Sequence, residues 1–230
     1  GWATEPIRDA SSIGVSAAAA LALLLSVVRR RAGVAGQQSE QYESSQTIVD
    51  RTGIERNLTP RDDQGKEFHP RWDLAAPVIG LVGLIAAGFG NGGNQLLETA
   101  RTLVGAAFLG SATDAMLLGH WYLVQPGLRR EPLLEQVSWL GRLWPLEVGL
   151  LLLPTGMWSV LSGAIDDGYG GMLGWFWAAC AVTTIALVFV TRAALRERQY
   201  AAVMAATGLL YLAILTAFGT DVVARLVLET

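Results

Sequence analysis

Apolar and polar residues follow one another along this chain in long blocks. Six runs of about 18 or more residues carry few charges, which is the length a helix needs to cross about 30 Å of hydrocarbon. These runs are 10–28, 74–90, 102–128, 143–165, 168–191 and 199–220. They lack the alternation of barrel strands, and only helices or closed barrels satisfy the backbone in lipid. The pattern therefore predicts an all-α integral membrane protein built as a bundle of six transmembrane helices.

One long polar block interrupts the apolar ones. Gln, Ser, Glu, Asp and Arg dominate residues 29–73, a stretch of about 45 residues with too few apolar side chains for a core of its own. We therefore expect three parts: 1–28 with the first span, the polar segment 29–73, and a five-helix membrane bundle over 74–230.

Composition agrees with the membrane class. Of the 230 residues, 52% are hydrophobic and only 16% are charged. The 17 Lys and Arg against 20 Asp and Glu leave a net charge of -3, which argues against a nucleic-acid partner because no basic excess exists to neutralise phosphates. The single cysteine, Cys180, excludes a disulfide framework and a cysteine-based metal site within this chain.

Basic residues give the predicted orientation, because they are retained on the cytoplasmic side of short loops. Three connections hold 14 of the 17 basic residues: those after the first, third and fifth spans. Both termini are then expected outside and segment 29–73 in the cytoplasm, in a multi-pass protein of a bacterial plasma (inner) membrane. Glu5 and Asp9 precede the first span and Arg29 to Arg31 follow it, which is typical of an anchor rather than of a signal peptide.

Three ionisable residues fall inside the predicted spans: Asp114, His120 and Glu147. Each costs about 2.5 to 3.5 kcal/mol at the bilayer centre, so such residues are candidates for function. Asp114 is expected near the midplane, neutral or paired within the bundle, and His120 about 9 Å nearer the cytoplasm at 1.5 Å per residue. Glu147 follows Arg142 by five residues, which predicts the same depth as His120 on the adjacent antiparallel span. The two side chains are therefore expected to face one another.

The same cytoplasmic side carries aromatic and basic residues. Trp121 and Tyr122 follow His120, and His69 and Arg71 precede the second span. Together with Glu147 and Asp114 they supply the components of a quinone head-group site or a proton-uptake path. The alternative is structural, because Trp and Tyr anchor any membrane protein at the interface and an intramembrane His often bonds a neighbouring helix. Both interpretations stay open.

Cofactor ligands are scarce. A haem between helices needs two axial ligands, and the spans offer His120 alone, since Met116 lies one turn away on the same helix. Haem is therefore disfavoured, whereas a bound lipid or quinone fits. No catalytic or metal-ligating set is expected. Asp166 and Asp167, in a glycine-rich connection, suit a tight turn better than a hard cation, which needs at least six oxygens.

Three functions remain compatible with these residues. The first is a non-catalytic, accessory membrane subunit of an energy-converting or electron-transfer assembly, with lipids and other membrane subunits as partners. The second is a small transporter or channel, favoured by Asp114 near the midplane and Pro154 at the middle of the fourth span. The third is a membrane-embedded enzyme acting on lipid. Small residues such as Gly80, Gly83 and Gly105 permit close backbone approach and make the second and third spans the pair expected to pack tightly.

Overall fold

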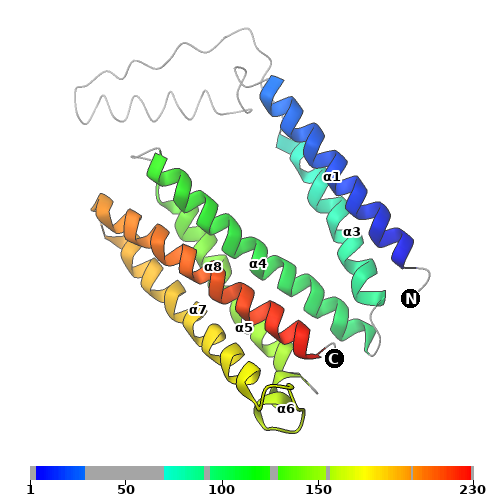
Figure 1. Ribbon diagram of the computed structural model, residues 1–230. Helices are drawn as coiled ribbons and strands as arrows, with labels where there is room; N and C mark the ends of the chain where they lie inside the picture. Colours follow the sequence, from blue (N-terminus) through cyan, green and yellow to red (C-terminus); the bar gives the residue numbers. More distant parts are fainter. Residues whose placement is uncertain are drawn as a thin grey trace, which may run out of the picture. The chain divides into compact units, whose positions relative to one another are not determined.

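The computed structural model describes residues 4–28, 70–90, 94–124, 129–153, 156–197 and 199–228 (Figure 1). Within these ranges the regular structure is entirely helical, and it falls into two compact units, Gly1–Gly90 and Asn91–Thr230. Four described helices are long and apolar enough to cross a membrane: α1, α4, α7 and α8. The predicted class, a helical membrane protein, is thereby confirmed.

Unit 1, Gly1–Gly90, contains an antiparallel helix pair. Helix α1 spans Glu5–Val28 and α3 spans Ala75–Gly90, with the short 3-10 helix η1 over Pro70–Leu74. A Cβ atom placed on Gly83 would lie 2.8 Å from Cβ of Ser11, so the two backbones approach closely. We expected the glycines of this span to pack against the third span, but Gly80 and Gly83 lie against α1.

Unit 2, Asn91–Thr230, is a bundle of four long helices (Figure 1). They are α4 (Gln95–Val124), α5 (Glu131–Leu152), α7 (Met172–Arg196) and α8 (Tyr200–Leu228), and the short α6 covers Met157–Leu161. Helix α4 packs against α5 and α8, and α7 packs against the same two, which closes a ring. Each helix in the ring runs antiparallel to both of its neighbours, as the short connections between them favour.

The bundle is apolar on its outside as well as in its core. Its buried side chains combine Phe108, Leu140 and Leu210 with the polar Thr184 and Thr220. Large apolar side chains also point outward from all four helices, among them Leu117, Trp139, Trp175, Phe189 and Leu215. An apolar exterior around a partly polar interior suits hydrocarbon as the surrounding solvent.

Helix α5 differs from the predicted fourth span, 143–165. It begins 12 residues earlier, at Glu131, and ends at Leu152, two residues before Pro154. Proline disfavours helix in the residue before it, so Pro154 ends this helix instead of interrupting a longer one. The early start follows from Leu133, Val137 and Leu140, which are buried at helical spacing on one face. The charge-free run does not include these turns because Glu131, Glu135 and Arg142 lie on their exposed side.

The connection from α6 to α7 is organised by Asp167. Its carboxylate accepts hydrogen bonds from the backbone N–H groups of Tyr169, Gly171, Leu173 and Gly174, at 2.8 to 3.4 Å. Desolvation raises the pKa of Asp167, but these four N–H groups lower it by more, and the net shift is below the ordinary 3.8. The turn interpretation of the two aspartates is supported, since Asp167 caps the N-terminus of α7.

Candidate functional site

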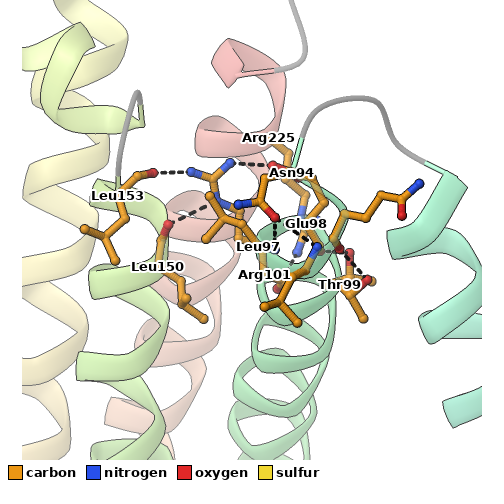
Figure 2. A network of polar contacts seen from close by, with 11 residues as sticks. Asn94, Leu97, Glu98, Thr99, Arg101, Leu150, Leu153 and Arg225 are labelled. Atoms are coloured by element: carbon orange, nitrogen blue, oxygen red, sulfur yellow. Dashed lines mark hydrogen bonds and ion pairs between the residues drawn. The ribbon is translucent and has the colours of Figure 1, made fainter.

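Five charged residues from three helices converge at the end of unit 2 where α4 begins and α8 ends. We call this group the charged centre: Glu98 and Arg101 of α4, Glu147 of α5, and Asp221 and Arg225 of α8. Arg101, Glu147 and Asp221 are buried. Figure 2 shows the part of this network around Arg101.

Arg101 ties α4 to the end of α5 (Figure 2). Its Nε donates to the carbonyl oxygen of Leu150 at 3.0 Å, and its Nη2 donates to that of Leu153. Its Nη1 donates to Oε1 of Glu98 at 2.8 Å. The final carbonyls of a helix have no partner within the helix, and Pro154 prevents α5 from continuing. Arg101 supplies the missing donors.

Arg225 plays a corresponding part between α8 and α4. Its Nε lies 2.9 Å from both carboxylate oxygens of Asp221, one turn earlier on the same helix. Its Nη2 donates to the backbone oxygen of Arg101 at 3.3 Å. The ion pair of α8 is therefore attached to the backbone of α4 at the level of the other arginine.

Glu147 is the group without a donor. Its side chain is 0% exposed, and neither carboxylate oxygen receives a hydrogen bond within the described residues. A Cβ atom on Gly105 would lie 3.5 Å from Oε1 of Glu147, 2.7 Å from Oδ1 of Asp221 and 2.5 Å from Nη2 of Arg225. The two carboxyl groups and the guanidinium thus gather over Gly105, where the missing side chain leaves room for them.

The balance of charges indicates what this arrangement does chemically. Three carboxyl groups, of Glu98, Glu147 and Asp221, face two guanidinium groups, of Arg101 and Arg225. With every group ionised, one negative charge is in excess, and a buried charge without a partner is costly. One proton on a carboxyl group makes the centre neutral. Uptake of one proton would therefore balance the charges of this centre.

The structure does not bring His120 and Glu147 together. Gly105, which lies beside Glu147, precedes His120 by 15 residues on α4, or about 22 Å at 1.5 Å per residue. His120 instead contacts Tyr211 of α8, with 3.2 Å between its Nδ1 and the tyrosine hydroxyl. The two side chains were expected at the same depth because the fourth span was predicted to start at residue 143, which placed Glu147 near its beginning. In the structure α5 starts at Glu131, so Glu147 lies near the other end of the helix.

The other predicted site residues lie apart from the charged centre. Tyr122 is buried and donates its hydroxyl to the carbonyl of Arg129, and Trp121 is exposed. Asp114 is exposed on α4, and the bundle partner expected for it is not seen among the described residues. Arg71 lies in η1 of unit 1, and His69 falls outside the described residues. Among the residues that can be described, no three or more His, Cys, Asp or Glu side chains form a metal-binding group.

Four members of the charged centre were missed from the sequence: Glu98, Arg101, Asp221 and Arg225. The predicted spans began at residue 102 and stopped at residue 220, which left these four outside the membrane helices. A signal was present, because Glu98 precedes Arg101 by three residues and Asp221 precedes Arg225 by four. Opposite charges at these spacings pair on one helix face, which indicates that the helices extend through them.

Unit 2 is thus a membrane-type four-helix bundle with a buried charged centre. No protein-family model matches the chain, and neither a curated protein nor a solved structure matches it. The geometry of this centre is therefore the basis on which a function can be inferred.

Proposed function

We propose that this protein is an accessory, non-catalytic membrane subunit of a larger energy-converting assembly, in which its charged centre binds a proton. The observation that carries the proposal is Glu147, fully buried with no hydrogen-bond donor in the described part of the chain. Ionisable groups kept inside a membrane bundle at such cost typically belong to proton or ion pathways. The scarcity of cofactor ligands favours a subunit that supports catalytic partners.

The proposal includes six membrane crossings, by α1, α3, α4, α5, α7 and α8, with both termini outside. Arg129, Arg130, Arg192 and Arg196 lie at the end of unit 2 where α4 and α7 finish, whereas Arg101 and Arg225 at the opposite end are held in ion pairs. By the positive-inside rule the first end faces the cytoplasm. The charged centre then lies in the outer half of a bacterial plasma membrane, with lipid against the exposed apolar side chains.

Cysteine labelling tests this topology. In a Cys180→Ala background, Ser162→Cys is expected to react with an impermeant thiol reagent added to intact cells, because it follows α6 at the outer end. Ser45→Cys is expected to react only after the cells are permeabilised. Labelling of position 45 in intact cells would overturn the orientation.

Purification from the native membrane in mild detergent tests the function. The chain is expected to co-purify with membrane subunits that carry redox cofactors. Glu147→Gln is expected to keep this association while lowering proton-coupled turnover at least about tenfold, a change of about 1.4 kcal/mol in the barrier. Glu135→Gln, which alters an exposed acid on the same helix, is the matched control. A chain that purifies alone as a colourless oligomer would contradict the proposal and favour a transporter, for which the same charged centre would couple transport to a proton.

We also propose that a quinone binds away from the charged centre, beside His120 and Tyr211. His120 and Tyr211 are both exposed on the outer surface of α4 and α8, and their rings meet edge to face with centroids 6.4 Å apart. Their polar atoms supply hydrogen bonds to the carbonyl oxygen of a head group dissolved in the bilayer. Loss of quinone-dependent turnover in His120→Phe, with turnover retained in Trp121→Phe, is the expected result.

A further inference from the structure

We infer that Glu147 and Asp221 hold a single proton between their carboxyl groups, and that this site selects a proton over an alkali cation such as sodium. The inference rests on the proposed function, because it names the ion that the charged centre binds. It also assigns different roles to the two carboxyl groups.

The geometry distinguishes the two acids. Asp221 presents both oxygens to Nε of Arg225 at 2.9 Å, which suits an ionised carboxylate. Glu147 receives no donor from the described residues, and its Oε1 and the Oδ1 of Asp221 lie 3.5 and 2.7 Å from the position that a Cβ atom on Gly105 would take, so the two carboxyl groups are neighbours. Two ionised carboxylates cannot form a hydrogen bond, because neither has a hydrogen to donate. One proton on Glu147, donated towards Asp221, satisfies both groups.

The arginine donors that the described parts of α4 and α8 bring to this end of the bundle are bonded to groups other than Glu147, and on α7 the buried Nε1 of Trp177 has no partner among the described residues. On α4, Arg101 is engaged with Glu98 and with two carbonyl groups of α5. On α8, Arg225 is engaged with Asp221 and with a carbonyl group of α4. The titratable group that α7 brings to this half of the bundle is the thiol of Cys180, which packs against Gly219. Helix α6 brings the apolar side chains of Met157 and Val160.

The same contacts disfavour a metal cation. Hard cations require several oxygen ligands, about six for magnesium or calcium. The carbonyl oxygens of Leu150, Leu153 and Arg101 at this end of the bundle each already accept a hydrogen bond from an arginine, which places a positive charge beside every one of them. Both guanidinium groups also repel a cation. A proton needs only the two facing oxygens of Glu147 and Asp221.

Infrared spectroscopy of the full-length protein in lipid tests the shared proton. At neutral pH we expect a carbonyl stretch from a protonated carboxyl group that shifts in D₂O. Glu147→Gln is expected to abolish the band, and Glu135→Gln, which alters an exposed acid on the same helix, is expected to leave it unchanged. Asp221→Asn is expected to retain the acid of Glu147 but to shift its frequency, because an amide replaces the carboxylate acceptor. A frequency unchanged in Asp221→Asn, or no band in the folded wild type, would overturn the inference.

Exchange of salts tests the selectivity. The band is expected to be identical in sodium and in potassium chloride at equal pH and ionic strength. A band lost in sodium alone would show that a metal cation displaces the proton and would overturn the selectivity. The proposed function would still be decided separately, by the co-purifying subunits and the turnover of Glu147→Gln. If Glu147→Gln loses the band but keeps normal turnover, the shared proton of the wild type stands, but it has no role in the proposed function.

Discussion

The carboxyl groups of Glu147 and Asp221 meet over Gly105, although the two acids lie on different helices and are separated by 74 positions in the chain. The absence of a side chain at residue 105 makes the meeting possible, because any Cβ there would collide with Asp221 and Arg225. Three helices therefore contribute to the meeting point of these two acids: α5 and α8 supply the carboxyl groups, and α4 supplies the space at Gly105.

Gly105→Ala is expected to disrupt the charged centre. Its Cβ would lie 2.5 Å from Nη2 of Arg225 and 2.7 Å from Oδ1 of Asp221, and overpacking of this kind costs about 1–3 kcal/mol. Gly110→Ala on the same helix is the control, since nothing lies within 4 Å of the position that its Cβ would take. Thermal unfolding in detergent measures both, and equal midpoints for the two variants would contradict the packing described for Gly105.

Arg101→Ala should destabilise unit 2 more than Arg142→Ala does. Arg101 donates to two carbonyl groups at the end of α5, and hydrogen bonds from a charged group are worth about 1.5–3 kcal/mol. Arg142 is exposed and stacks on the Trp139 ring at 5.2 Å, a contact worth about 0.5–1 kcal/mol. Chemical or thermal unfolding of the two purified variants gives the comparison, and a smaller effect at Arg101 would refute its capping role.

A disulfide between positions 4 and 90 would test the packing of the two helices in unit 1. A Cβ on Gly90 would lie 3.8 Å from Cβ of Thr4, which is the spacing of a disulfide. The pair Thr4→Cys and Gly90→Cys, in a Cys180→Ala background, is therefore expected to oxidise readily. Adding Gly83→Ala should lower the yield, because its Cβ would lie 2.8 Å from Cβ of Ser11, whereas Gly80→Ala meets Val15 at an ordinary 3.5 Å and should not. Equal yields for the two would argue against close backbone contact at Gly83.

Acid should loosen the connection before α7. The folded state holds the pKa of Asp167 below 3.8, so its carboxylate stabilises the folded loop above that pH and loses this effect as the pH falls through the folded value. Cleavage of the loop by pepsin, measured relative to cleavage of an Asp167→Asn variant at the same pH, is therefore expected to accelerate as the pH is lowered towards about 2.

Two variants isolate this effect at neutral pH. Asp167→Asn should already make the loop more sensitive to thermolysin, because it weakens four hydrogen bonds to the start of α7. Asp166→Asn, which weakens one bond to Gly168, should leave the cleavage rate close to that of the wild type. Identical cleavage of the two variants would contradict the capping role of Asp167.

The helical membrane class followed from the sequence because long apolar blocks are a consequence of hydrocarbon thickness. The ends of the helices did not follow, because they are set by partners distant in sequence. Arg101 and Asp221 lie within helices since each finds a charged or carbonyl partner there, and Glu131 starts α5 because Leu133 and Val137 face the core. Once the start of α5 was misplaced, the depth of Glu147 and its pairing with His120 were misplaced as well. The helical spacing of opposite charges beside the apolar runs, as in Glu98 and Arg101 or Asp221 and Arg225, indicated that α4 and α8 continue through these residues.

The buried threonines of the bundle have a consequence for how the protein is made. Thr184, Thr207 and Thr220 each donate to a carbonyl group one turn earlier on their own helix, so α7 and α8 enter the bilayer with these hydroxyls already satisfied. Helix α5 is different, because the carboxyl group of Glu147 finds its partner on α8, which the ribosome makes later. The contact between Glu147 and Asp221 can therefore form only after α8 has been made, which is late in the assembly of the bundle.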